Sequence, residues 1–343
     1  MRITIFYKCL ALLLVCIIIT ASYIYYCFNS PLNISADNIS FDIVRGDSIS
    51  KVADQLHQSG MLQHDKVFVF VAYVTRQSRN IKAGEYLISK NSTAKQLLEK
   101  FASGDVVKRQ ITFLEGWTFK QILEELKHND NIEFTINGLS PEAIMGKLEL
   151  GNENPEGRFF PDSYRYEKGI DAQTILRMAY ERMNTILQEE WRERDQNVPY
   201  KNAYEALIMA SIIEKETGAP DERARIAAVF VNRLKLGMPL QTDPTVIYGL
   251  GDAYKGNLTR AHLLQDTPYN TYTRVGLPPT PIASAGKAAI HAALHPASEK
   301  VLYFVGKGDG THYFSQTLTE HNQAVRQYQL NINKSDYHSS PSR

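Results

Sequence analysis

ASIIEKETG, the sequence of residues 210–218, places two carboxylic acids, Glu214 and Glu216, at the end of an apolar segment. Asn202 is a favoured N-cap residue, and Glu205 three positions later completes a capping-box pattern. The segment stops at a glycine, as helices commonly do at their C-terminus. We therefore predict one helix that carries both acids at its C-terminal end.

Apolar residues at helical spacing lead to each of the two acids. The stripe that leads to Glu216 consists of Ala206, Met209 and Ile213. The stripe that leads to Glu214 consists of Leu207, Ala210 and Ser211. A carboxyl group that continues an apolar stripe is partly removed from water, and one at a helix C-terminus faces the negative end of the helix dipole. Both effects raise the pKa, which suits a general acid. The alternative is the solvated end of an ordinary helix, and the spacing alone leaves both readings open.

The composition limits the class of protein. The chain has 343 residues, a hydrophobic content of 43% and a net charge of +1, which allows two domains and argues against nucleic acid as the main partner. The cysteines, Cys9, Cys16 and Cys27, all lie in the first apolar segment. The rest of the chain therefore has no disulfide framework and no cysteine-based metal site.

The N-terminal segment predicts the localisation. Residues 9–28 carry no charge and are mostly apolar, and as a helix they span about 30 Å, the thickness of the hydrocarbon layer. Arg2 and Lys8 precede the segment, whereas Asp37 and Asp42 follow it. The positive-inside rule then places the N-terminus, residues 1–8, in the cytoplasm and the rest of the chain outside.

A cleaved signal peptide is the alternative to a membrane anchor. The sequence YIYYCF at residues 23–28 is a poor cleavage site, whereas its aromatic side chains suit a membrane interface. We therefore expect an uncleaved, single-pass protein of the cell inner membrane with an extracytoplasmic (periplasmic) catalytic domain.

A polar linker at residues 29–39 leads to a small module at residues 40–106. The pattern predicts a strand, two helices, a strand and a third helix, at 41–44, 48–60, 64–73, 82–88 and 93–104. The order and the turn sequence RGDSI resemble the LysM-like subdomain found beside cell-wall enzymes. A generic α+β spacer explains the same pattern equally well.

Residues 107–332 are expected to form a larger α+β domain, and residues 333–343 a polar tail. The elements predicted there are a strand at 107–114, a helix at 119–126, a helix at 171–191, a helix capped by 221–223, a hairpin at 301–315 and a closing helix at 320–331. The face of the 171–191 helix is Ile175, Met178, Ala179, Met183 and Ile186. Residues 131–154 receive no assignment.

Two further segments contain candidate residues, and each has a structural explanation. Asp243 precedes Pro244, and this pair is a standard helix start, so capping is the structural explanation for Asp243. The loop DTPYNTY at residues 266–272 combines hydroxyl, amide and ring groups, which can bind sugar hydroxyls and stack on sugar rings. An ordinary surface turn has the same composition.

Other chemistries fit the sequence less well. His291 and His295 have the spacing of zinc ligands, but no Glu follows the first His and Pro296 ends the helix. Ser211 lacks the context of a hydrolase nucleophile, and the glycines at 306, 308 and 310 belong to a hairpin. We therefore expect no metal and no cofactor.

Glycan cleavage is the reaction that best fits the two carboxylic acids. A two-carboxylate glycosidase needs its acid and its nucleophile or base on opposite sides of the bond. Glu214 and Glu216 lie on different faces of one helix, so they cannot easily flank one bond. A mechanism with a single carboxylate is more natural.

Five motifs resemble those of the YceG-like endolytic murein transglycosylases. They are ASIIEKET (210–217), VFVNRL (229–234), LQTDPTVIYG (240–249), YNTY (269–272) and GLPP (276–279). The resemblance implies cleavage of the β-1,4 bond between N-acetylmuramic acid and N-acetylglucosamine within peptidoglycan strands, with a 1,6-anhydromuramyl end as the product. It also implies an effect on strand length and peptidoglycan synthases as partners.

The resemblance assigns roles to residues. It implies a lysozyme-like catalytic helix whose Glu-Thr dipeptide makes Glu216 the catalytic acid and base. The residues that it implies in the substrate groove are Gln241, Asp243, Thr245, Tyr248, Tyr269, Asn270, Tyr272 and, as a neighbour, Glu214. Two alternatives remain: a membrane-anchored peptidoglycan-binding scaffold without activity, and a glycan hydrolase of lysozyme type.

Overall fold

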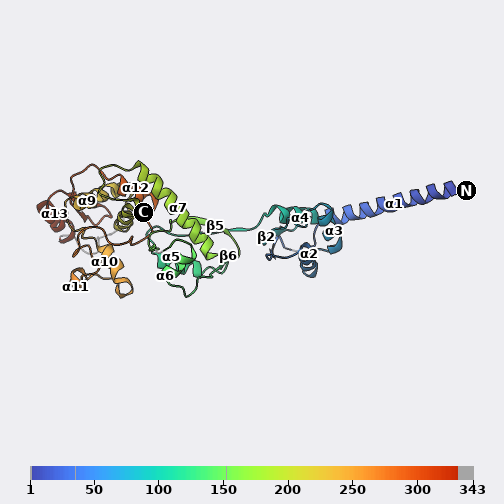
Figure 1. Ribbon diagram of the computed structural model, residues 1–343, viewed down its shortest axis with the longest axis horizontal. Coiled ribbons are helices and arrows are strands. Elements are labelled where there is room, and N and C mark those ends of the chain that lie inside the picture. The colour runs from blue at the N-terminus through green and yellow to red at the C-terminus, as the bar shows by residue number, and fades with distance from the viewer. Residues whose placement is uncertain (1, 35, 152, 331–343) are drawn as a thin grey trace. The chain divides into compact units, whose positions relative to one another are not determined.

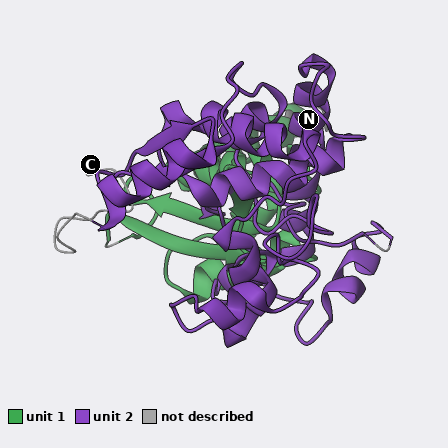
Figure 2. Ribbon diagram, turned by 90° about the vertical axis from the view of Figure 1, so that its left-hand side faces the viewer, with its two compact units in different colours: residues 1–109, 165–170 green, residues 110–164, 171–343 purple. Residues whose placement is uncertain are grey.

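The computed structural model describes residues 2–34, 36–151 and 153–330, and the predicted polar tail lies outside this range. The chain divides into two compact units, coloured separately in Figure 2. Unit 1 comprises residues 1–109 and 165–170, and unit 2 comprises residues 110–164 and 171–343.

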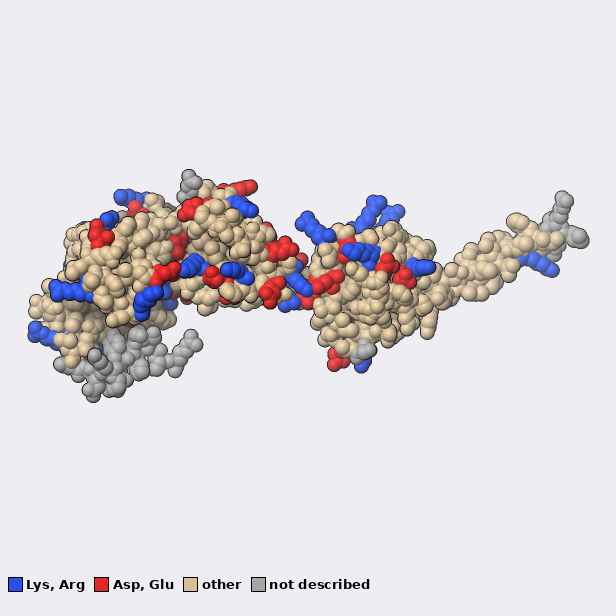
Figure 3. All heavy atoms as spheres, turned by 90° about the horizontal axis from the view of Figure 1, so that it is seen from below, with Lys and Arg blue, Asp and Glu red and all other residues tan. Residues whose placement is uncertain are grey.

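Unit 1 begins with the long helix α1 (Arg2–Asn29) and continues with a small α+β module (Figure 1). Residues 5–29 of α1 are apolar enough to cross a membrane, with a mean hydropathy of 2.3. Figure 3 shows this helix without acidic side chains on the face drawn, and with a basic side chain only near its N-terminal end. The helix therefore fits the predicted single membrane span in length and composition.

The module of unit 1 has the predicted element order. Its elements are β1 (Asn38–Ile43), α2 (Ile49–Gln58), α3 (Asp65–Val74), β2 (Gly84–Ser89) and α4 (Ala94–Ser103). Strands β1 and β2 pair in antiparallel fashion, with Phe41 opposite Tyr86. Ser48 caps α2, and Thr93 caps α4 through a capping box. Gly104 ends α4 in the left-handed conformation, at φ 74°.

Unit 2 is mainly helical. Its elements are β3 (Lys108–Thr112), α5 (Phe119–Lys127), β4 (Ile132–Glu133), α6 (Pro141–Lys147), β5 (Ser163–Glu167), β6 (Ile170–Asp171), α7 (Ala172–Glu193), α8 (Ala203–Glu216), η1 (Pro220–Glu222), α9 (Arg223–Lys235), α10 (Asp243–Leu250), η2 (Gly251–Ala253), α11 (Arg260–Leu264), α12 (Lys287–Leu294), β7 (Tyr303–Gly306), β8 (His312–Ser315), α13 (Leu318–Val325) and η3 (Arg326–Leu330). Three of these strands, β3, β5 and β6, contain residues of both units. Strands β7 and β8 form the predicted antiparallel hairpin.

Helix α8 lies at the centre of the unit 2 core. Its residues 206–213 are all buried, and the helix packs against α7, α9, α10 and α12. A helix that is apolar on every side is a core helix, which explains why apolar stripes lead to both acids. The hydrophobic segment thus fixes the position of α8, and the two acids extend from its C-terminal end.

Several local predictions need correction. Asn202 does cap α8, but the Glu205 carboxylate accepts from the backbone N–H of Lys201 (2.7 Å), so the capping box is not closed. Helix α8 ends at Glu216 and not at residue 218. Met178 is exposed, because the buried face of α7 is centred on Ile175, Ala179 and Met183 and turns away from position 178.

Other corrections concern helix starts and an unassigned segment. Helix α9 begins after Glu222, whose side chain makes no capping bond. The N-cap of α10 is Thr242, so Asp243 is the first helical residue. Residues 131–154 contain α6, which Ser140 caps through its side chain. The closing helix begins earlier than expected, at Leu318, and its described part ends as the π-helix η3.

Candidate active site

Glu216 is the last residue of α8. The helix ends there because Thr217 is extended, at φ −143° and ψ 135°. The hydroxyl of Thr217 accepts a hydrogen bond from the Ala219 backbone N–H (2.9 Å), which stabilises the turn after the helix. The rigid core helix therefore holds the Glu216 side chain at a fixed point.

The carboxyl group of Glu216 is removed from water. Burial raises its pKa to about 7, and the neighbouring charge of Asp243 acts in the same direction. The hydroxyl of Thr242 donates a hydrogen bond to Glu216 Oε1, which opposes the rise. A carboxyl group with this pKa is substantially protonated near neutral pH, as a general acid must be.

The segment before α10 holds Thr242 in place. Gln241 has a left-handed backbone, at φ 53°, and its N–H donates to the carbonyl of Thr271 (3.0 Å). The N–H of Thr242 donates to the hydroxyl of Thr271 (3.1 Å), and the hydroxyl of Thr245 donates to the carbonyl of Thr242 (2.8 Å). Thr245 is fully buried. These bonds aim the Thr242 hydroxyl at Glu216.

A groove of about 640 Å³ opens beside Glu216. Three more of the residues predicted for substrate binding line it, namely Gln241, Asp243 and Tyr272. The hydroxyl of Tyr272 donates to Asp243 Oδ1 (2.6 Å), so the two residues form one polar wall. The hairpin and the helix α13 contribute further lining residues, among them Tyr303, Phe304, His312 and His321.

The remaining predicted residues lie outside the groove lining. The hydroxyl of Tyr248 donates to Glu156 Oε2 (3.1 Å), and the hydroxyl of Tyr269 bonds with that of Thr280 (2.9 Å). The rings of Tyr248 and Tyr269 meet edge to face, with centroids 4.9 Å apart. These contacts pack α10 against the 266–280 segment.

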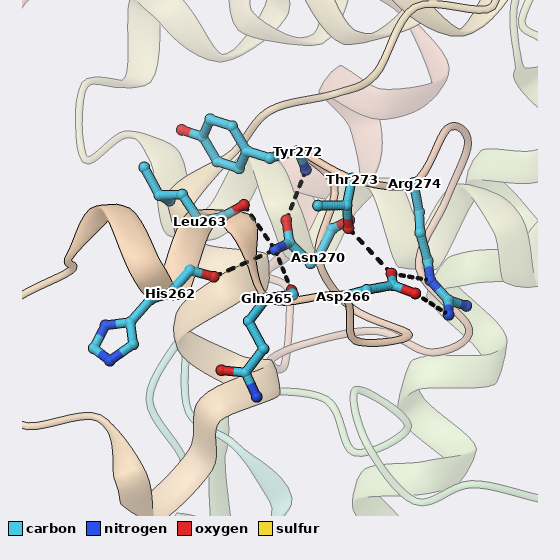
Figure 4. A network of polar contacts seen from close by, with 8 residues as sticks. All are labelled: His262, Leu263, Gln265, Asp266, Asn270, Tyr272, Thr273 and Arg274. Carbon is cyan, nitrogen blue, oxygen red and sulfur yellow. Dashed lines mark hydrogen bonds and ion pairs between the residues drawn. The ribbon is translucent and has the colours of Figure 1, made fainter.

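Asn270 organises the loop that carries Tyr272, as Figure 4 shows. Its side chain is 1% exposed. The amide nitrogen donates to the carbonyl groups of His262, Leu263 and Gln265, and the amide oxygen accepts from the N–H of Tyr272 (2.8 Å). These bonds fully occupy the amide of Asn270, so the structure gives it a positioning role.

Glu214 has different neighbours from Glu216. Its Oε2 atom accepts from the N–H of Gly286 (2.9 Å) at the start of α12. Burial raises the pKa of Glu214, and the nearby charge of Glu115 contributes. Glu214 is not among the residues that line the groove, although both acids have a raised pKa.

Sequence reasoning missed three residues of this region. Thr242 bonds directly to Glu216, and Arg233 lines the groove from α9. The buried guanidinium of Arg233 donates to the carbonyl groups of Leu302 (2.7 Å) and Leu240 (2.8 Å), which joins the hairpin to the active-site segment. Glu156 is buried, and burial raises its pKa to about 7. Of these three residues, only Arg233 could have been noticed in the sequence, because it is a charged residue inside the apolar motif VFVNRL.

A separate cluster has the side chains of a metal site. Glu190 of α7, His291 of α12 and His295, the C-cap residue of α12, place their ligand atoms within 4.8 Å of one another. In the structure Glu190 pairs with His291 (2.7 Å) and Lys287 (3.4 Å), which joins the two helices. No Glu follows His291 in the sequence, and in the fold Glu190 of α7 supplies a carboxylate beside it.

Comparison with known proteins identifies the family. A model of the YceG-like family matches residues 41–327. The chain belongs to the YceG-like family. An endolytic murein transglycosylase of Bacillus subtilis (strain 168) is 33% identical over 313 residues, which are 86% of this chain and 86% of that protein. An endolytic murein transglycosylase of Streptococcus pneumoniae serotype 2 is 26% identical over 344 residues, and the matched region covers 88% of this chain and 61% of that protein.

A solved YceG-like structure has the same fold. The crystal structure of a YceG-like protein from Listeria monocytogenes superposes with a TM-score of 0.53 at 30% identity, over 84% of this chain and 98% of that one. The mixed helix and sheet architecture of the present chain is therefore a YceG-like fold. Glu216 and the residues predicted for the groove lie within the region that the family model matches.

Proposed function

We propose that this chain is an endolytic murein transglycosylase in which Glu216 is the catalytic acid and base. One observation carries the assignment: the groove holds the carboxyl group of a half-buried glutamate at the end of a rigid helix, and its pKa is raised to about 7. The names of the curated relatives support the same reaction.

The proposed reaction needs one carboxyl group. Protonated Glu216 donates its proton to the glycosidic oxygen while the bond from that oxygen to C1 of N-acetylmuramic acid breaks. The carboxylate then accepts the proton of the muramyl 6-hydroxyl as O6 bonds to C1. The products are a free 4-hydroxyl on N-acetylglucosamine and a 1,6-anhydromuramyl end, and no water is consumed. The acetamido group of the substrate stabilises the oxocarbenium-like centre in place of a second carboxylate.

Asp243 has a supporting electrostatic role in this proposal. Its carboxylate accepts from Tyr272 (2.6 Å), which stabilises the negative charge. A negative charge close to Glu216 disfavours ionisation of Glu216 and so keeps the proton available for the leaving oxygen. Glu214 does not serve as the second carboxylate, because it bonds to Gly286.

The predicted substrate-binding residues divide into two groups in this proposal. Gln241, Asp243 and Tyr272 line the groove and would contact the glycan. Thr245 and Asn270 hold this wall in place, through bonds to Thr242 and Tyr272. Tyr248, Tyr269 and Glu214 bond to residues outside the wall. The aromatic ring of Tyr303, on β7, provides a surface for a sugar ring within the same groove.

The proposed setting is the outer face of the membrane. Helix α1 would anchor the chain as a single-pass protein with a cytoplasmic N-terminus, since Arg2 and Lys8 precede the apolar stretch. The β1–α2–α3–β2 order supports a LysM-like module at residues 40–106, followed by a catalytic domain at 107–332 with a lysozyme-like helix. Action on nascent strands beside peptidoglycan synthases, with an effect on strand length, belongs to this proposal.

Digestion of purified glycan strands by Glu216→Gln tests the assignment, with Glu214→Gln as the matched control. We expect Glu216→Gln to lower the rate of anhydromuramyl formation by about 10³-fold or more, because it removes the carboxyl group proposed to donate and accept the proton, whereas Glu214→Gln should cost roughly tenfold or less. Wild-type activity in Glu216→Gln would overturn the assignment. Products with a reducing end, heavier by one water in mass spectra, would indicate a hydrolase; binding without products would indicate a scaffold.

A further inference from the structure

Helix α3 of unit 1 is apolar on its outer face as well as on its inner face. Phe68 and Ala72 are buried in the core. On the outer side Phe70, Tyr73 and Val74 are 53%, 59% and 65% exposed. Their spacing of three and four residues places them on one face of the helix. A helix that faces water on one side normally carries polar residues there, so this apolar face needs a partner.

The end of α1 is fixed to the same unit. Cys27 is buried, Phe28 packs against the unit 1 core, and Leu32 belongs to that core. The ring of Tyr23 meets the ring of His64, the N-cap residue of α3, with centroids 6.0 Å apart. Helix α3 therefore begins directly beside α1.

This contact sets the depth at which α3 lies. Tyr23 precedes Phe28, the end of the uncharged stretch, by five residues, or about 7–8 Å along the helix axis. If residues 9–28 cross the hydrocarbon layer, Tyr23 lies just inside its outer boundary, where tyrosine is favoured. Because His64 contacts Tyr23, the start of α3 then lies close to this outer boundary of the hydrocarbon layer.

Basic residues flank the apolar face. Lys66 is exposed in the first turn of α3, and Arg76 and Arg79 are exposed just after its end. A short helix with an apolar face and basic neighbours is the pattern of a segment that lies in the interface of an anionic membrane.

We propose that the Phe70–Tyr73–Val74 face of α3 inserts into the outer leaflet of the bilayer that α1 crosses. The occupant is the lipid surface itself: the aromatic and aliphatic side chains enter the headgroup region, and Lys66, Arg76 and Arg79 contact anionic headgroups. Unit 1 then rests on the membrane. This inference depends on the proposed membrane anchor, and the experiment separates the two.

The test uses the full-length chain in vesicles of phosphatidylcholine and phosphatidylglycerol, some of them brominated on the acyl chains near the headgroup. Tryptophan is introduced by Phe70→Trp, by Leu87→Trp as the control, and by Tyr25→Trp in α1. Leu87 lies on β2 of the same unit and is 41% exposed. The signal of Trp117 and Trp191 is subtracted with the wild-type chain. We expect the brominated lipid to quench Phe70→Trp at least about twofold more than Leu87→Trp.

Each outcome decides between the proposals. Quenching of Tyr25→Trp and Phe70→Trp, with little at Leu87→Trp, supports the inference. Quenching of Tyr25→Trp alone overturns it and leaves the anchor in place. Equal quenching at positions 70 and 87 overturns it as well, because the contact is then not specific to α3. Absence of quenching at position 25 overturns the anchor and, with it, the inference.

Discussion

The hydroxyl of Thr242 donates a hydrogen bond to the carboxyl group of Glu216 across a sequence separation of 26 residues. Burial raises the pKa of Glu216 to about 7, and this hydrogen bond acts in the opposite direction. The bond stabilises the ionised form, which is the form required when Glu216 accepts the proton of the muramyl hydroxyl. Burial and the Thr242 hydrogen bond therefore set the pKa of Glu216 between the needs of the proton-donating step and those of the proton-accepting step.

Thr242→Val should shift the pH profile of kcat/KM. Without the hydroxyl donor the carboxylate form loses stabilisation, so the pKa of Glu216 rises. The protonated acid then persists to higher pH, and the descending limb of the profile, near pH 7 in the wild type, should move upward by roughly half to one unit. Initial rates of anhydromuramyl formation from pH 5 to 9 measure the shift.

Thr245→Val is the matched control for Thr242→Val. Thr245 is also a buried threonine of α10, and its hydroxyl bonds to the carbonyl of Thr242 and not to Glu216. Its loss should lower stability and loosen the position of Thr242, so the descending limb should move less than in Thr242→Val, in which the hydrogen bond to Glu216 is lost completely. An equal shift in both variants would mean that the limb responds to loop disorder and does not report on Glu216.

Asp243→Asn should shift the same limb in the opposite direction. The substitution removes a negative charge that raises the pKa of Glu216, so the descending limb should move to lower pH by roughly half a unit. Asparagine still accepts the hydrogen bond of Tyr272. Tyr272→Phe removes that bond and keeps the charge, so it should give the smaller shift. An upward shift in Asp243→Asn would contradict the proposed role of Asp243.

Glu156→Gln should change how the stability of the protein depends on pH. Glu156 has a pKa raised from 4.5 to about 7 by burial, so between these values the folded state holds a proton that the unfolded state has lost. Stability therefore falls as pH rises through this window. Glutamine does not titrate, so the variant does not lose stability in this way. The difference in free energy of unfolding, variant minus wild type, should therefore rise by about 3 kcal/mol between pH 4.5 and 7.5. Urea unfolding at several pH values measures the difference, and parallel pH curves for both proteins would refute the prediction.

Structural features that depend on residues close together in the chain could be predicted from the sequence. The helices expected at 48–60 and 93–104 are present, and Ser48 and Thr93 cap them, because a cap needs only a backbone N–H two or three residues away. The segment before Glu216 was recognised as a helix because its apolar residues are dense. Helix α6 was missed although Ser140 and Pro141 form a helix start, since a helix of seven residues shows little periodicity.

The site depends on contacts between distant segments. Asp243 looked like an N-cap, yet its neighbour Thr242 takes that position, and the Asp243 carboxylate accepts from Tyr272, 29 residues away. Glu156 meets Tyr248 across 92 residues. Local spacing carries no information on such pairs. The choice of Glu216 over Glu214 needed the family motifs, because a helix buried on all sides leads equally to both acids.

Gly157, in the sequence EGRFFPD at residues 156–162, lies against the 281–283 segment. Gly157 and Gly138 have nearly the same left-handed backbone, at φ 71° and 73°, so alanine brings similar strain at both positions. They differ in space: a Cβ atom at Gly157 would lie 2.4 Å from Cβ of Pro281 and 3.1 Å from the carbonyl of Ala283, whereas no atom lies within 4 Å at Gly138.

Gly138→Ala should therefore lower the free energy of unfolding by about 1 kcal/mol, the cost of the backbone strain alone. Gly157→Ala should cost about 2–4 kcal/mol, because the 281–283 segment must also move. That segment leads to Gly286, which binds Glu214, so the displacement extends toward the end of α8. Urea midpoints of both variants measure the difference, and equal losses would show that close packing at Gly157 does not contribute to stability.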